Sequence, residues 1–107
     1  MEVDTPIKSV PFVVIAEFEV KPGCMPDFLA AAADDAQHSV RDEAGCRQFD
    51  VIRPEGTEHT VVFYEVYDSR AAFDTHLATP HLARFRDVIP ALVEREREVR
   101  FAERIHP

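Results

Sequence analysis

The sequence predicts an α+β domain in which helices cover one face of a four-stranded antiparallel sheet. Three observations lead to this prediction. A β-branched and aromatic run lies near the N-terminus, an alanine-rich segment follows it directly, and two more strand-like runs flank a turn-rich stretch. A second helical region and a last alternating segment complete the order β-α-β-β-α-β. That order is the ferredoxin-like plait.

The first strand is predicted over residues 11–20, "PFVVIAEFEV", and residues 21–23, "KPG", form a turn. Residues 25–45, "MPDFLAAAADDAQHSVRDEAG", are predicted to be a helix because alanine has the highest helix propensity. Gly45 suits the position just past the end of that helix. The predicted buried stripe repeats every four residues and consists of Phe28, Ala32, Ala36 and Val40.

Two strands are predicted next, at residues 46–54, "CRQFDVIRP", and residues 60–67, "TVVFYEVY". They form a hairpin whose loop, residues 55–59, is longer than two residues. A short helix is then predicted over residues 68–78, with Asp68 or Ser69 as its N-cap.

Thr79 and Pro80 restart a helix over residues 79–89, because threonine is a good N-cap and proline loses nothing at the first helical position. Pro90 is expected to end or kink this helix. Residues 94–105, "EREREVRFAERI", alternate well enough to be one last strand.

The predicted sheet is apolar on both faces, which helices on one side cannot explain. Val61 and Phe63 lie on one face of their strand, and Val62, Tyr64 and Val66 lie on the other. In an antiparallel sheet with one solvent-exposed face, apolar and polar residues should alternate more regularly along each strand. We therefore expect a homodimer in which a second copy covers the outer face. The 107 residues are predicted to be one domain, residues 11–107, after a tail at residues 1–10.

Composition excludes several classes of function. The formal net charge of −8 disfavours nucleic acid and anionic membranes as partners, because both bind basic surfaces. No segment approaches the roughly 20 apolar residues of a membrane span, and the N-terminus does not look like a secretory signal. We therefore expect a cytoplasmic protein whose two cysteines, Cys24 and Cys46, stay reduced.

The stretch "HLATPHLARF" contains two histidines, His76 and His81, on either side of the helix restart. His76 shares the side of its helix with Phe73, three residues earlier. Their simplest interpretations are a helix-end histidine for His76 and a surface residue for His81. Metal ligands on helices favour one-turn spacing, and these two are five residues apart across a break. The spacing therefore predicts that no metal is bound.

Two acidic residues occupy strand positions where a carboxylate is unexpected. Glu65 lies between Phe63 and Tyr67 on its own strand face, and Asp50 lies between Phe49 and Val51. A buried carboxylate is costly unless it is paired, and burial would raise its pKa. Either the strand face that carries the acid is partly exposed to solvent, or one of these acids pairs with a histidine to form a general base.

The ordered pieces "GCRQFDVIRP", "YEVY" and "AFDTHLATPH" resemble the antibiotic biosynthesis monooxygenase superfamily, especially its quinol monooxygenase branch. They also resemble the isomerase of a phosphorylated quorum-sensing autoinducer in the same superfamily. The resemblance covers about residues 11–93. It implies a dimeric α/β barrel and a pocket between helices and sheet. It also implies a reaction of dioxygen with a deprotonated quinol or phenol, without metal, flavin or haem.

The resemblance also implies roles for individual residues. His76 would be the catalytic base and Glu65 would orient it, with His81 or Asp50 as the partner if Glu65 points to the other face. The candidate walls of a pocket for a small aromatic substrate are Phe49, Phe63, Tyr67 and Phe73.

Two departures from the family pattern argue against haem and polycyclic anthrones as substrates. They leave a quinol oxygenase and an isomerase as alternatives. The chain has no Trp and no Asn, residues that haem-degrading and anthrone-oxidising members use in their pockets. An isomerase would need cations for a phosphate group, which arginines at positions 47, 53, 84 and 86 could supply. A non-catalytic dimeric ligand-binding module is the third alternative, because folds of this kind are reused.

Overall fold

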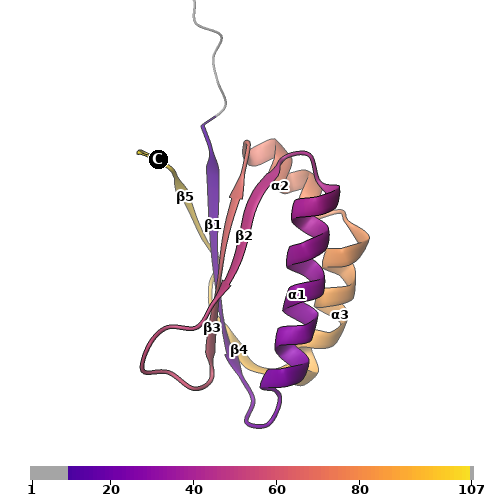
Figure 1. Ribbon diagram of the computed structural model, residues 1–107, viewed down its shortest axis with the longest axis vertical. Coiled ribbons are helices and arrows are strands. Elements are labelled where there is room, and N and C mark those ends of the chain that lie inside the picture. Colours follow the sequence, from indigo (N-terminus) through magenta and orange to yellow (C-terminus); the bar gives the residue numbers. More distant parts are fainter. Residues whose placement is uncertain (1–9, 107) are drawn as a thin grey trace, which may run out of the picture.

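An antiparallel sheet of five strands, one more than predicted, forms one layer of the molecule. The computed structural model describes residues 10–106, so nearly all of the predicted tail at residues 1–10 lies outside the described residues. The strand order is β2-β3-β1-β4, from β1 (Phe12–Val20), β2 (Cys46–Ile52), β3 (Thr60–Tyr67) and β4 (Val93–Glu96). Strand β1 lies in the middle of the sheet, and β2 and β3 form the predicted hairpin (Figure 1). The ferredoxin-like plait is confirmed.

The C-terminal segment differs from the single strand predicted for residues 94–105. It forms two strands, because β5 (Arg100–Glu103) follows β4 and pairs with the same strand, β1. Strand β4 pairs with the Phe18–Val20 end of β1 and β5 pairs with the Phe12–Ile15 end. The nine residues of β1 are long enough to hold both short strands one after the other.

Three helices lie on the same side of the sheet (Figure 1). They are α1 (Met25–Asp42), α2 (Arg70–His76) and α3 (Pro80–Leu92). The Ser69 hydroxyl caps α2 by accepting from the Ala72 N–H, and the Thr79 hydroxyl caps α3 by accepting from the Leu82 N–H. Both predicted caps form, and the Ser69 alternative is the correct one.

Pro90 does not end α3, as we expected it could, because the helix continues to Leu92. The missing proline N–H removes one hydrogen bond in the last turn only. The end of the helix is closed by the Val93 N–H, which donates to the carbonyl of Ile89. Ile89 stays buried against the core, so the last turn keeps its packing.

The buried stripe of α1 departs from the predicted four-residue repeat. Phe28 and Ala32 are buried as expected, but the next buried residues are Asp35 and Ser39, whereas Val40 is 46% exposed. The helix has 3.6 residues per turn, so a strict repeat of four rotates about 40° away from the core with each turn. The correct continuation brings polar side chains into the interior.

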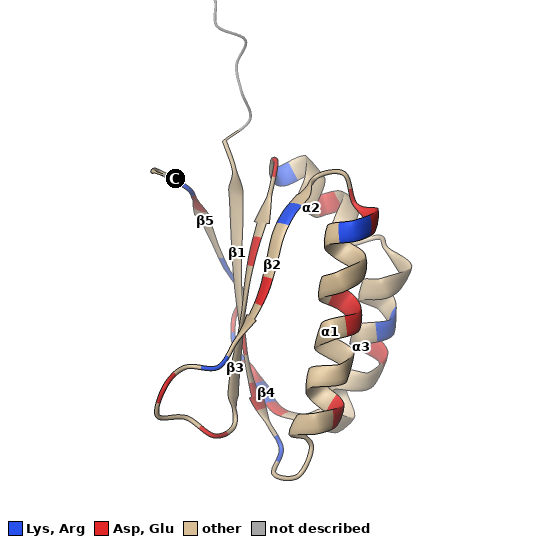
Figure 2. Cartoon of the chain, in the orientation of Figure 1, with Lys and Arg blue, Asp and Glu red and all other residues tan. Residues whose placement is uncertain are grey.

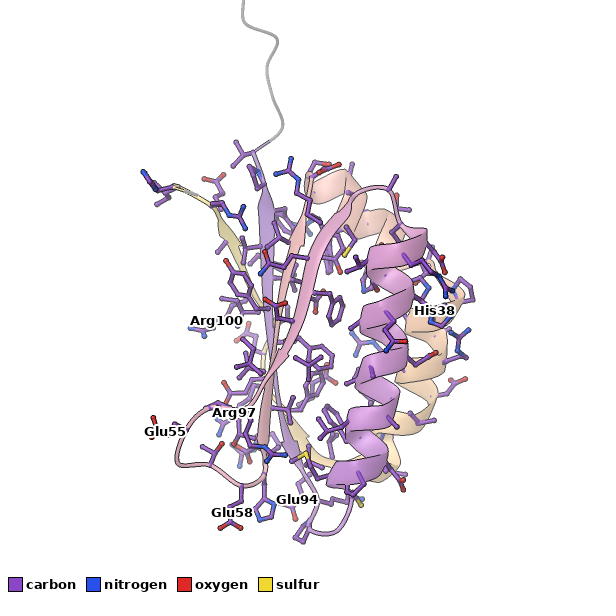
Figure 3. The ribbon with its side chains drawn as sticks, in the orientation of Figure 1. His38, Glu55, Glu58, Glu94, Arg97 and Arg100 are labelled. Atoms are coloured by element: carbon purple, nitrogen blue, oxygen red, sulfur yellow. The ribbon has the colours of Figure 1, made fainter. Side chains whose placement is uncertain are left out.

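Aromatic rings fill one part of the space between helices and sheet, where side chains from both layers meet (Figure 3). We call Phe18, Phe28, Phe63 and Phe85 the aromatic cluster. The ring centroids of Phe18 and Phe63 are 4.9 Å apart, and those of Phe18 and Phe28 are 5.3 Å apart. All four side chains are buried, so this cluster is the centre of the apolar core.

The outer face of the sheet is partly apolar. Ile15, Val62 and Tyr64 are half-buried there, and Ile52 is exposed. Arg97 and Arg100 project on this side, away from the helices (Figure 3). Acidic and basic positions are interspersed along the elements and do not form a basic face in this view (Figure 2). Within residues 10–106, none of the helices has the length and apolar character needed to cross a membrane.

Candidate active site

A small cavity lies between the helices and the sheet. Its volume is about 40 Å³, and its polar lining includes Asp35, Glu65 and His76. Much of the remaining wall is apolar and includes Phe63 and Phe73. A cavity of this size can hold a few water molecules but not an aromatic ring. The space is therefore water-sized, with a few polar groups set in a mostly apolar wall.

Glu65 faces the helices and not the outer face of the sheet. It is 5% exposed, and its Oε1 accepts a hydrogen bond of 2.6 Å from the Tyr67 hydroxyl. Burial raises the pKa of Glu65 to about 8, although the bond from Tyr67 opposes this. Burial and the neighbouring Glu65 also raise the pKa of Tyr67. At neutral pH Glu65 is therefore mainly a protonated acid, which can donate a proton.

The carboxylate beside His76 belongs to Glu43, not to Glu65. Glu43 Oε2 lies 2.8 Å from Nδ1 of His76 and 2.5 Å from Nε2 of His81. All three side chains are buried. A carboxylate oxygen accepts from both rings, which assigns the protons to Nδ1 of His76 and Nε2 of His81. Nε2 is then the His76 nitrogen that is left to accept a proton.

A glycine lets α2 approach the segment that carries Glu43. Glu43 follows the last residue of α1 with an extended backbone, φ −104° and ψ 114°, and turns inward. A Cβ atom on Gly45 would lie 2.6 Å from Cβ of Ala72, so only glycine fits beside α2. We expected Gly45 to follow the helix end directly, but its function is this close contact between the loop and α2.

Asp35 and Ser39 extend the polar site along α1. Ser39 Oγ donates to Asp35 Oδ1 at 3.3 Å and lies 3.5 Å from Nδ1 of His76. Burial raises the pKa of Asp35 to about 6, against the opposing effect of His76 and His81. One ligand atom from each of Asp35, His76 and His81 lies within 4.8 Å of the others. The helix break therefore brings together two rings that their sequence spacing separated.

Asp50 lies away from this site. It is exposed on the outer face of β2, where it accepts a hydrogen bond of 2.6 Å from Gln48 Nε2. Cys46, also in β2, is buried, and burial raises the pKa of its thiol to about 12, so it stays protonated. Both cysteines are free.

The four predicted aromatic walls are all buried around His76 or the cavity. Phe63 and Phe73 line the cavity. The ring centroids of Tyr67 and Phe49 lie 5.3 Å and 6.2 Å from that of His76. The imidazole ring of His76 is therefore packed against aromatic side chains.

The four arginines considered for phosphate binding do not gather at the cavity. Arg47 pairs with Asp68 and Arg84 pairs with Asp34, both on the surface, and Arg53 is exposed. Arg86 lines the cavity, but it pairs with Glu96 at 3.0 Å.

Sequence reasoning missed Glu43, Asp35 and Ser39. Helical periodicity in the sequence could have predicted them. With 3.6 residues per turn, the buried stripe of Phe28 and Ala32 continues through positions 35, 39 and 43, which are all polar. Polar residues on the buried side of a helix lower the stability of the fold unless they are paired, so they indicate a functional site.

The chain matches the antibiotic biosynthesis monooxygenase family over residues 11–88. It is 31% identical over 90 residues to the uncharacterized protein sll1783 of Synechocystis, a match covering 84% of this chain and 60% of that relative. It is 35% identical over 86 residues to "Putative monooxygenase Rv0793" of Mycobacterium tuberculosis, covering 79% of this chain and 82% of that protein. The solved structure of Rv0793 superposes with a TM-score of 0.81 at 28% identity, covering 91% and 97% of the two chains. The chain therefore belongs to the antibiotic biosynthesis monooxygenase family.

Proposed function

We propose that this protein is a cofactor-independent monooxygenase that oxidises a small quinol or phenol with dioxygen, acting as a homodimer in the cytoplasm. One observation carries the proposal: a buried carboxylate, Glu43, holds the ring of His76 at the wall of a small cavity. Family membership supports an oxygenase in general, and the aromatic lining supports an aromatic substrate.

The chemistry needs a base, because a phenolate gives up electrons much more readily than a phenol. Nε2 of His76 takes the phenolic proton, and Glu43 stabilises the imidazolium that forms. The electrons of the substrate reduce dioxygen: one oxygen atom forms a bond to the ring and the other leaves as water. Glu65, a protonated acid at neutral pH, supplies a proton to the departing oxygen. Hydroquinone plus dioxygen then balances as hydroxyquinone plus water.

The small volume of the cavity means that the substrate enters through a rearrangement. A space of about 40 Å³ does not admit a phenol ring. The wall contains Leu77, which is 50% exposed at the end of α2, so the wall reaches the surface there. Displacing such a side chain enlarges the cavity without unfolding the aromatic cluster.

The homodimer would use the outer face of the sheet. Ile15, Val62 and Tyr64 lie at its centre, half-buried, and Ile52 is 44% exposed beside them. A second sheet packed against this face would remove these side chains from water. Light scattering at low micromolar concentration should give twice the chain mass of 12.2 kDa, and a stable monomer would contradict this part of the proposal.

The decisive experiment measures dioxygen uptake by metal-free protein with a panel of hydroquinones. His76→Ala should lower turnover with a responsive quinol by about 10²–10⁴-fold, the usual contribution of general base catalysis. His59→Ala, in the exposed hairpin loop, is the matched control and should not change it. Circular dichroism checks that both variants fold.

Each remaining outcome decides against the proposal. A folded His76→Ala variant with undiminished turnover would remove His76 as the base. Quinol binding without dioxygen uptake would identify a ligand-binding module instead. Turnover of a phosphorylated dione without dioxygen would identify an isomerase, although the separated arginines do not favour it.

A further inference from the structure

Four buried side chains meet where the end of α1 approaches α2 and α3. We call Asp35, Glu43, His76 and His81 the histidine–acid cluster. We propose that this cluster is a binding site for one divalent transition-metal ion of the zinc class, which enters from the surface and takes His76 out of its role as a base. The inference goes beyond the proposed oxygenase, because it concerns the protein without substrate.

The donor atoms already lie close to the positions that a metal needs. One atom each from Asp35, His76 and His81 lies within 4.8 Å of the others, and Glu43 Oε2 contacts both rings. Tetrahedral zinc has bonds of about 2.0–2.2 Å to nitrogen and oxygen, which puts its ligand atoms about 3.3 Å apart. The Glu43 contacts of 2.8 and 2.5 Å must lengthen slightly, and the Asp35 side must close. Rotations of side chains accomplish both changes.

An unpartnered oxygen gives a second, independent indication. Glu43 Oε1 is a buried atom without a hydrogen-bond partner in the described part of the chain, and the Glu43 side chain is only 6% exposed. Leaving a buried acceptor unsatisfied costs about 1–3 kcal/mol. A cation placed between the rings and this carboxylate would satisfy it.

The charges of the cluster fit a divalent ion. Asp35 and Glu43 carry two negative charges when ionised, and two neutral imidazoles complete four ligands. Among residues 10–106, the contacts of these acids are with Ser39 and the two histidines, not with lysine or arginine. Burying uncompensated carboxylates is costly, and a divalent cation compensates both. Imidazole with carboxylate is a ligand set that suits zinc and copper.

A surface depression gives the ion a path to the cluster. It has a volume of about 480 Å³, and Glu43, Thr79 and His81 are among the residues that line it. The cavity of about 40 Å³ is lined by the other two members of the cluster, His76 and Asp35. A metal ion can therefore reach the site without passing through the substrate cavity.

The test is a calorimetric titration of Zn²⁺ into chelator-treated, tag-free protein. We expect one ion per chain. His81→Gln and Asp35→Asn should each weaken binding by about 100-fold or more, because even supporting residues around a metal contribute 10–100-fold. His59→Gln is the matched control for adventitious binding to a surface histidine, and it should bind Zn²⁺ as the wild type does.

A thermal unfolding measurement keeps the test valid if one variant is unstable. Zn²⁺ should raise the midpoint of the wild type and of His59→Gln, but not that of Asp35→Asn or His81→Gln. Equal Zn²⁺ affinity in wild type and His81→Gln, or no stoichiometric binding to the wild type, would overturn the proposal. Because no substrate is present, failure here leaves the oxygenase proposal standing, and an inactive quinol panel leaves this one standing.

Discussion

The space between helices and sheet contains two regions of opposite character. The aromatic cluster is wholly apolar, whereas the histidine–acid cluster buries four ionisable side chains. Helix α1 contributes to both: Phe28 enters the first region, and Asp35 and Ser39 enter the second. The two regions show that one continuous interior can be divided along a single helix into an apolar part and a part with ionisable side chains.

The energetic reasons for the two regions differ. Burial of a large aromatic side chain removes apolar surface from water and adds ring contacts, both of which favour folding. Burial of carboxyl groups has the opposite sign unless partners compensate, and one oxygen of Glu43 has no partner in the described structure. The aromatic cluster therefore offsets the cost of the histidine–acid cluster. Variants in each region should separate stability from activity.

The largest effect on stability is expected from Phe28→Ala. Removal of this fully buried ring should lower the free energy of unfolding by about 3–5 kcal/mol, because it leaves a cavity among Phe18, Phe63 and Phe85. Glu43→Gln, in the other region, should lower stability less but reduce quinol turnover by about 10–100-fold. Urea denaturation and dioxygen uptake measure the two quantities. If Glu43→Gln lost as much stability as Phe28→Ala, the division between the regions would be wrong.

The next effect is a dependence of stability on pH. Burial raises the pKa of Glu65 from 4.5 to about 8, so the folded chain holds this proton more tightly than the unfolded chain. The contribution of this group is complete below about pH 4.5 and is lost as pH rises through about 8. Glu65→Gln should therefore flatten the decline in the free energy of unfolding over this window, which amounts to a few kcal/mol.

Denaturation with urea at several pH values measures this slope. Glu55→Gln, on the exposed hairpin loop (Figure 3), is the control and should keep the slope of the wild type. An unchanged slope in Glu65→Gln would show that Glu65 is ionised in the folded protein.

The smallest effect concerns the contact between α2 and the loop that carries Glu43 and Gly45. Gly45→Ala should cost about 1–3 kcal/mol, because its Cβ would lie 2.6 Å from Cβ of Ala72 and the core would be overpacked. It should also weaken turnover by displacing Glu43 from His76. Ala72→Gly removes the opposing methyl group, so the double variant should recover part of both losses, as a double-mutant cycle would show. Additive losses would mean that the two positions do not clash.

The sequence predicts the aromatic region better than the histidine–acid cluster. Phe63 and Phe28 lie on periodic faces of their strand and helix, so the alternation of the strand and the turns of the helix were sufficient to place them inside. Glu65 was found because it is a polar residue among apolar neighbours, and His76 because it matches the histidine in the family resemblance. The partner of His76, Glu43, depends on how the end of α1 meets α2, and a linear pattern does not contain that information. The partner of Glu65, Tyr67, is two residues away on the same strand face, so strand alternation places the two side by side. The strict four-residue repeat also concealed Asp35 and Ser39.

The shortness of α2 has a consequence for how often the cavity beside it opens. Seven residues are too few for a stable isolated helix, so α2 is held by its cap at Ser69, the packing of Phe73 and the contact with Gly45. Such an element opens by local unfolding at a lower free energy than the whole domain. Its amide protons should therefore exchange with deuterium sooner than those of α1. Each opening would release Leu77 and His76 together. In the proposed reaction, the fluctuation that admits a substrate would therefore also free the His76 base from its contacts.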